Sequence, residues 1–235
     1  MPVADGGTGV TAGLSPPRAR RDGRVLLLAG GAGGLLLLVL GWVVDRWATP
    51  GVDRWLAGSG GGSGSTMRSV ADTVSSAGGL PWWWLACTIL LVGSLRKRQW
   101  WTAAAAAVVA LVAGYGRTAL AEWIARPRPP SAGPDAYLNS FPSGHAAQVT
   151  TAAVVLSVWA WYHLRAAAPA IVIGSAVCAM VVGVSRVVTG QHWATDVAGG
   201  WLFGAAAPML LLGAGIWADA ARNDNLEPSA PFPSA

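Results

Sequence analysis

Apolar residues fill long stretches of this sequence, and short polar, arginine-bearing or glycine-rich stretches separate them. A helix needs about 20 mostly apolar residues to cross the hydrocarbon core of a bilayer. Six segments reach or approach this length, at residues 25–44, 80–95, 103–120, 146–161, 167–184 and 197–217. The pattern predicts an all-α polytopic membrane protein, a bundle of six transmembrane helices.

The regions outside these segments predict the domain limits. Residues 1–23 are rich in Gly, Pro, Ala and Arg without helical periodicity, and residues 220–235 end in a proline-containing stretch, so both are expected to be disordered tails. The six-span domain is then expected at 24–219. Within it, the tract 58–66 reads GSGGGSGST, which cannot bury a core and predicts a flexible loop.

Composition supports a membrane protein and argues against two other classes. Hydrophobic residues make up 53% of the chain and charged residues 11%, whereas soluble domains average roughly 45–50% and about 25%. The net charge is +5, but the cations lie between apolar segments rather than on one basic face, so no nucleic-acid partner is expected. Cys87 and Cys178 lie inside apolar segments without metal-ligand spacing, and no metal site is expected.

The distribution of Lys and Arg in the loops predicts the orientation. With a cytoplasmic N-terminus, nine cations fall on the inner side and seven on the outer side, and the tight clusters beside span ends, at 18–24 and 96–98, are all on the inner side. The chain is therefore expected to be integral to the plasma membrane with both termini in the cytoplasm.

Three polar clusters fall at span ends that this topology places together on the extracytoplasmic side. The first contains Arg126 and Arg128, the second is Pro-Ser-Gly-His at 142–145, and the third begins with Ser185 and Arg186 and continues to 196. Because three separate loops bring polar side chains to one face, we expect them to form one site.

The histidines of these clusters suit nucleophilic and acid catalysis. His192 and Asp196 are four residues apart, so at a helix start they share a face and the carboxylate can accept a ring N–H. This contact fixes the tautomer and makes the other ring nitrogen a better nucleophile. His145 can donate a proton to a departing oxygen.

The other polar residues of the clusters suit phosphate. The planar guanidinium groups of Arg126, Arg128 and Arg186 match pairs of phosphate oxygens. Ser143 and Gly144, at a predicted helix start, present a hydroxyl and backbone N–H groups to an anion, and glycine permits close approach.

These clusters resemble the signature of the type-2 phosphatidic-acid phosphatase superfamily, which reads Lys-x6-Arg-Pro, Pro-Ser-Gly-His and Ser-Arg-x5-His-x3-Asp. The second and third motifs are complete in this chain. In the first, the lysine position holds Ala121 when counted from Arg128 and Ala119 when counted from Arg126. Arg117, one helical turn before Ala121, is the nearest cation.

The resemblance implies a six-helix bundle whose site opens to the extracytoplasmic face and uses no metal or other cofactor. It implies a phosphohistidine on His192, with Asp196 as its partner and His145 as the acid. The phosphate-binding residues that it implies are Arg128, Ser143, Gly144 and Arg186, and Arg126 and Arg117 are further candidates.

The predicted function is hydrolysis of a lipid phosphate monoester or lipid pyrophosphate, of the polyprenyl pyrophosphate, phosphatidate or phosphatidylglycerol phosphate class. The expected partners are this lipid substrate and the bilayer. Two alternatives remain open: a lipid phosphotransferase in which another hydroxyl captures the phosphohistidine, or a lipid-phosphate-binding homologue whose turnover is weakened by the missing lysine.

Overall fold

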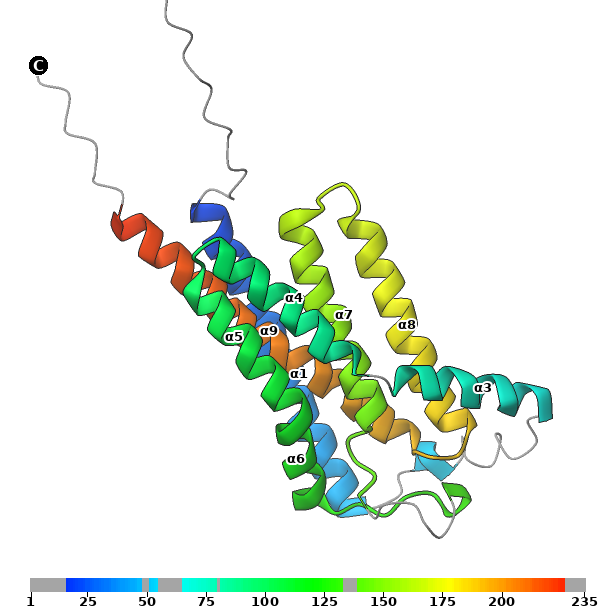
Figure 1. Cartoon of the computed structure of the whole chain (residues 1–235). Coiled ribbons are helices and arrows are strands. Elements are labelled where there is room, and N and C mark those ends of the chain that lie inside the picture. The colour runs from blue at the N-terminus through cyan, green and yellow to red at the C-terminus, as the bar shows by residue number, and fades with distance from the viewer. Residues whose placement is uncertain (1–15, 48–50, 55–64, 80, 133–138, 227–235) are drawn as a thin grey trace, which may run out of the picture.

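The computed structural model describes residues 16–47, 51–54, 65–79, 81–132 and 139–226, and this part of the chain contains helices and no β-strand. Figure 1 shows them as a bundle of long helices with α3 lying across one end. The helices are α1 (Pro16–Trp47), α3 (Ser65–Gly78), α4 (Trp82–Arg96), α5 (Trp100–Leu111), α6 (Arg117–Ile124), α7 (Gly144–His163), α8 (Ala168–Val188) and α9 (Ala194–Leu226). A π-helical turn, Val112–Gly116, joins α5 to α6, and a 3-10 turn, Pro130–Ala132, follows them.

All six predicted segments are helical, and the prediction of an all-helical membrane bundle is confirmed, but the count of six spans is not. Among the described residues, five helical stretches are long and apolar enough to cross a membrane: Pro17–Trp47 in α1, Thr66–Arg96 over α3 and α4, Trp100–Ile124 over α5 and α6, Ala168–Val188 in α8 and Ala194–Asn223 in α9. The fourth predicted span, 146–161, lies in α7, which is not among the five. Because α7 packs against α4, α8 and α9, protein rather than lipid covers much of its surface, and it can carry polar residues.

The predicted limits of the tails need correction. α1 begins at Pro16 and α9 continues to Leu226, so residues 16–23 and 220–226 are helical. Proline is favoured in the first helical turn, which suits the start of α1. The last two residues of the predicted loop at 58–66 already belong to α3. The remainder of that loop, and residues 1–15 and 227–235, lie outside the described residues.

The first and last helices pack along each other through glycines. A Cβ atom placed on Gly30 of α1 would lie 2.9 Å from the backbone nitrogen of Leu210 in α9, and one on Gly23 would lie 2.9 Å from the carbonyl oxygen of Gly213. In a membrane, small residues allow helix backbones to approach closely and gain packing contacts. The extensive contact between α1 and α9 therefore depends on these positions.

A buried carboxylate joins α9 to α5 at the end of the bundle where the described chain begins and ends. Asp219 of α9 accepts hydrogen bonds from the backbone nitrogens of Trp101 and Thr102, at 3.1 and 2.9 Å, and from the Thr102 hydroxyl at 2.7 Å. The first N–H groups of a helix have no partner within the helix. Asp219 thus satisfies two of these donors at the start of α5.

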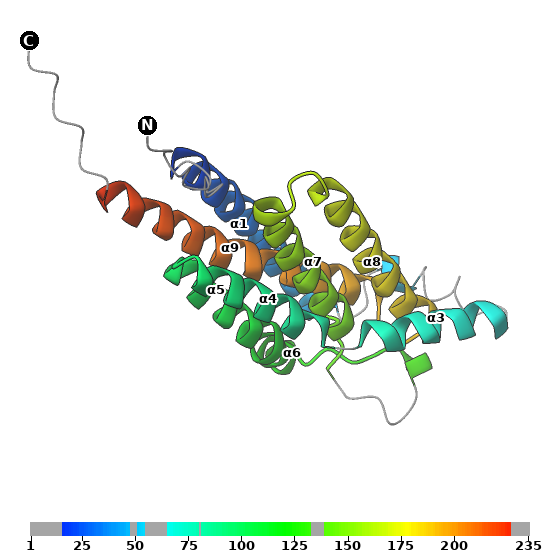
Figure 2. The ribbon, with the colours of Figure 1, turned by 45° about the horizontal axis from the view of Figure 1, so that its top comes forward.

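The three predicted motifs lie at the other end of the bundle. Figures 1 and 2 show the start of α1 and the end of α9 together at one end. The loops after α6, before α7 and between α8 and α9 lie at the opposite end, near α3. The topology therefore gathers these loops, as the sequence predicts, on the side away from the described chain ends.

Candidate active site

A tight turn between α8 and α9 sets the position of His192. Gly190 has a φ of 70°, in the left-handed region that favours glycine, and a Cβ there would lie 2.5 Å from the hydroxyl oxygen of Ser131. That hydroxyl donates to the Gly190 carbonyl at 2.9 Å, and the backbone nitrogen of His192 donates to the Arg186 carbonyl at 3.2 Å. One hydrogen bond from the 3-10 turn after α6 and one within the turn itself thus fix the conformation of this turn.

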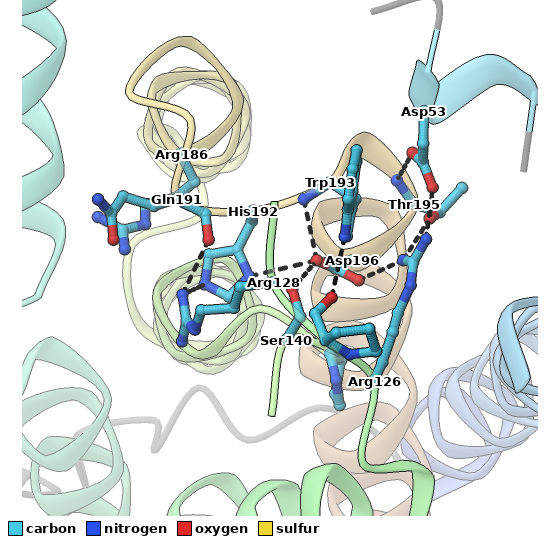
Figure 3. Close-up of polar contacts among 12 residues, drawn as sticks. Asp53, Arg126, Arg128, Ser140, Arg186, Gln191, His192, Trp193, Thr195 and Asp196 are labelled. Carbon is cyan, nitrogen blue, oxygen red and sulfur yellow. Dashed lines mark hydrogen bonds and ion pairs between the residues drawn. The ribbon is translucent and has the colours of Figure 1, made fainter. Parts of the chain in front are cut away.

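The imidazole of His192 lies between a carboxylate and a guanidinium group (Figure 3). Its side chain is buried; Nδ1 lies 3.5 Å from Oδ2 of Asp196, at the outer limit of a hydrogen bond, and Nε2 lies 3.1 Å from Nη1 of Arg128. Burial lowers the pKa of His192 below its ordinary value, Asp196 opposes this decrease and Arg128 adds to it. The ring is therefore neutral at neutral pH, and Nε2 carries a lone pair facing Arg128.

Asp196 is fully buried, and three groups besides His192 surround its carboxylate. Oδ2 accepts from the backbone nitrogen of Trp193 at 2.9 Å and from the Ser140 hydroxyl, and Oδ1 accepts from Arg126. A buried carboxylate stays ionised only when it is paired and hydrogen-bonded. These partners hold Asp196 as an anion beside His192.

Arg126 lies against two buried carboxylates. Its side chain is buried, with Nη2 2.6 Å from Oδ2 of Asp53 and Nη1 2.7 Å from the hydroxyl of Thr195, and it also pairs with Asp196. Its guanidinium carbon lies 5.7 Å from the centre of the Trp193 ring. Since the group is enclosed by two carboxylates, the sequence-based interpretation of Arg126 as a phosphate ligand is revised to that of a support for Asp196.

Arg128, two residues later, lies on the side of the histidine ring. Ala125 follows the last residue of α6 with a φ of 50°, in the left-handed region, and the chain then turns away from the helix axis. Nη1 of Arg128 donates to the carbonyl oxygen of Gln191 at 2.9 Å, besides its contact with His192. The turn at Ala125 thus carries two arginines to opposite sides of the His192 and Asp196 pair.

The start of α7 lies against α9 and next to Arg117. The backbone nitrogen of Ser143 donates to the carbonyl oxygen of Asp196 at 2.9 Å, and a Cβ on Gly200 would lie 2.7 Å from the Ser143 carbonyl oxygen. A Cβ on Gly144 would lie 3.7 Å from Nη1 of Arg117. The Ser143 hydroxyl is buried and has no hydrogen-bond partner among the described residues. A cation, an unpaired hydroxyl and a helix N-terminus therefore meet here.

Arg186 and His145 complete the cluster. Nη1 of Arg186 donates to the Ser75 hydroxyl of α3, while its Nε is buried without a partner in the described part of the chain. His145 interacts electrostatically with four predicted site residues. They are Arg186, His192, Arg128 and Arg117. A Cβ on Gly79, just after α3, would lie 2.6 Å from Nε2 of His145, so this glycine allows the chain to pass close to the ring.

Several residues of this network were not predicted from the sequence, and Ser140 and Asp53 are two that contact charged groups of the site. Ser140 precedes the second motif, and Asp53 belongs to an Asp-Arg-Trp triplet that also occurs at 45–47. Asp45 is exposed whereas Asp53 is buried, and only their positions in space distinguish them. No group of three or more His, Cys, Asp or Glu side chains suited to a metal ion occurs among the residues described.

Arginines and a helix N-terminus surround a neutral imidazole here, an arrangement that is suited to binding a phosphoryl group. Residues 108–214 match the model of the PAP2 superfamily, which confirms the resemblance that the motifs indicate.

A solved structure has a similar fold. It is a transmembrane PAP2-type phosphatidylglycerolphosphate phosphatase from Bacillus subtilis, with a TM-score of 0.61 and 23% sequence identity over 86% of this chain and 98% of that one. No curated protein matches the sequence. At this identity the likeness shows the fold, a transmembrane helix bundle.

Proposed function

We propose that the protein hydrolyses a lipid phosphate monoester or lipid pyrophosphate, without a metal, through a phosphohistidine on His192. The observation that carries the proposal is the buried imidazole whose Nδ1 faces Asp196 and whose Nε2 faces Arg128, 3.1 Å away. A phosphoryl oxygen bound by Arg128 would lie next to that nitrogen. The PAP2 superfamily match supports the same class of reaction.

The two steps of the reaction follow from these positions. In the first, the Nε2 lone pair of His192 forms a bond to phosphorus, and the bond from phosphorus to the leaving oxygen breaks. Burial and the nearby Arg186 lower the pKa of His145 to about 4, and the negative charge of a bound phosphate opposes this decrease, which favours the protonated imidazole that gives the leaving oxygen its proton. In the second, the neutral His145 takes a proton from water, the water oxygen attacks phosphorus, the bond to Nε2 breaks and phosphate is released. Asp196 stabilises the positive charge that the ring of His192 acquires in the first step.

The arginines stabilise the charge on the transferring phosphoryl group. Arg128 and Arg186 present fixed guanidinium forks, and the N-terminus of α7 with the Ser143 hydroxyl adds neutral donors. Donors that are already fixed by the protein need no reorganisation during the reaction. The hydrogen bond from Arg186 to Ser75 and that from Arg128 to Gln191 supply such fixation.

The extracytoplasmic location of the site is supported by charge. Seven cations fall on the side of the site and nine on the side of the described termini. Four of the seven are the arginines at 117, 126, 128 and 186, which contact site groups. Without these four arginines, three cations on the side of the site compare with nine on the side of the described termini. The side richer in cations is expected to face the cytoplasm.

Phosphate release from a panel of lipids tests the proposed function. The purified protein in detergent, with a metal chelator present, is expected to release phosphate from at least one of phosphatidate, phosphatidylglycerol phosphate and polyprenyl pyrophosphate. Phosphate and product lipid are measured side by side. If folded protein released phosphate from none of them, or only after a metal was added, the proposal would be contradicted.

Arg117 is proposed to supply the charge of the missing motif lysine. It lies one helical turn before Ala121 on the same face of α6, and its guanidinium group lies beside the start of α7. Replacing Arg117 with alanine is expected to lower kcat/KM about 100-fold, because one donor to the phosphoryl group is lost. Arg117→Lys is expected to retain more activity, and the exposed Arg46→Ala, at the same end of the bundle, serves as the control. Unchanged kcat/KM in Arg117→Ala would exclude this role.

The panel also separates hydrolysis from transfer. A lipid or sugar alcohol added as acceptor is expected to leave the yield of free phosphate unchanged when water is the acceptor. A phosphotransferase would instead form a phosphorylated acceptor at the expense of phosphate.

A further inference from the structure

Asp53 lies in the short helical segment 51–54, after α1 in the sequence, yet its carboxylate reaches the start of α9. The residue is 1% exposed. Oδ1 accepts from the backbone nitrogen of Thr195 at 3.0 Å, and Oδ2 accepts from the Thr195 hydroxyl at 2.5 Å and from Nη2 of Arg126 at 2.6 Å. Figure 3 shows Asp53 at the outer end of the contacts that lead to Asp196.

These contacts give the carboxylate two tasks. Thr195 is the second residue of α9, and its N–H is one of those without a partner inside the helix, so Asp53 caps α9 from a distant part of the chain. Arg126 bridges Asp53 and Asp196, and both carboxylates and the arginine are buried. The two negative charges thus share one positive charge.

We propose that Asp53 is a positioning residue for the reaction, which holds Arg126 and the start of α9 so that Asp196 keeps its carboxylate and its charge directed at His192. The proposal rests on the proposed function for its kinetic consequence. Its structural part, the electrostatic link from Asp53 to His192, can be measured without turnover.

The direction of this link follows from the charges around the ring. His192 is faced by Asp196 from α9, by Arg128 from the segment after α6, by Arg186 from α8 and by His145 from α7. Without the charge of Asp53, the positive charge of Arg126 is no longer shared between two carboxylates and offsets more of the field of Asp196. The positive form of His192 is then less stable, and the pKa of its imidazole falls further below the ordinary value.

The test compares two aspartates that stand in the same sequence triplet. Asp53→Asn removes the buried charge, and Asp45→Asn removes an exposed one at the same end of the bundle. In detergent micelles, NMR titration of labelled histidine is expected to place the pKa of His192 lower in Asp53→Asn than in the wild type and in Asp45→Asn. The chain has three histidines, so His145→Asn and His163→Asn variants assign the signals.

Steady-state kinetics with the lipid of the panel that releases most phosphate gives the second measurement. In Asp53→Asn, kcat is expected to fall roughly 10- to 100-fold with little change in KM, because geometry around the nucleophile is altered while the phosphate-binding arginines remain. The acid limb of the pH profile of kcat/KM is expected to move to lower pH with the pKa of His192. A loss of stability alone would lower the active fraction without moving this limb.

The outcomes separate the two proposals. If the wild type releases no phosphate from any lipid, the proposed function fails, while the titration still decides the electrostatic link. If the wild type is active, and Asp53→Asn has the same His192 titration curve and the same kcat as the wild type, the positioning role is overturned. If Asp53→Asn does not fold, Thr195→Val serves as the second variant, because it keeps both charges and removes the hydroxyl between them. This variant is expected to lower kcat about tenfold. A wild-type kcat in Thr195→Val would likewise overturn the positioning role of Asp53.

Discussion

Replacing His192 with alanine is expected to lower phosphate release at least about 1000-fold, to the background of the assay. The substitution removes Nε2, which faces Arg128 and is proposed to form the bond to phosphorus. The measurement is the initial rate of phosphate release at saturating lipid, together with the melting temperature of the purified variant.

A matched histidine provides the control. His163 lies at the other end of α7, where its ring stacks on Trp159 and Nδ1 lies 2.9 Å from the Trp159 carbonyl oxygen. His163→Ala is expected to retain the wild-type rate in folded protein. Brief incubation of the wild type with phosphate-labelled lipid is expected to give an acid-labile phosphoprotein, which His192→Ala does not form. A rate within tenfold of wild type in His192→Ala would exclude a phosphohistidine at this position.

Replacing Asp196 with asparagine is expected to lower kcat about 1000- to 10,000-fold. An amide at this position no longer stabilises a positive charge on the ring of His192, and its NH₂ group can favour the wrong tautomer. The change also leaves Arg126 with one carboxylate instead of two, so the melting temperature is expected to fall. Both quantities are measured on the same preparation.

Substitution of Asp219 is the control that distinguishes an effect on catalysis from an effect on stability. It lies on the same helix, is also buried and also accepts three hydrogen bonds, but its partners are at the start of α5. Asp219→Asn is expected to lower the melting temperature while the kcat of the folded fraction stays near wild type. Equal losses of kcat in both variants would show that Asp196 acts through stability and not through His192.

The sequence predicts the membrane bundle and the identity of most site residues because each depends on short-range pattern. Apolar length marks a span, and the spacing of His192 and Asp196 places them on adjoining turns of one chain segment. That the three loops meet at one end of the bundle follows from counting the helices between them. The segment in α7 is predicted as a span from its length. Because α7 carries polar residues inside the bundle, its mean hydropathy is low for a span.

What the sequence does not predict depends on long-range packing. Arg126 and Arg128 are each followed by proline in the sequence, and only the turn at Ala125 and the place of α9 decide which one meets carboxylates and which one meets the histidine. Asp45 and Asp53 share a triplet, and only the fold buries one of them. The ends of α1 and α9 continue past the apolar segments because the two helices support each other there.

The contact between Asp53 and Thr195 spans 142 positions of the sequence, from the loop after the first helix to the start of the last. During translation the region of Asp53 leaves the ribosome early and that of Thr195 leaves it late, and domains fold as their parts emerge. The proposed nucleophile and its supporting charges therefore come together only after the final helix has entered the bilayer. A chain that stops short of α9 lacks Thr195 and Asp196, so it cannot form the proposed catalytic centre.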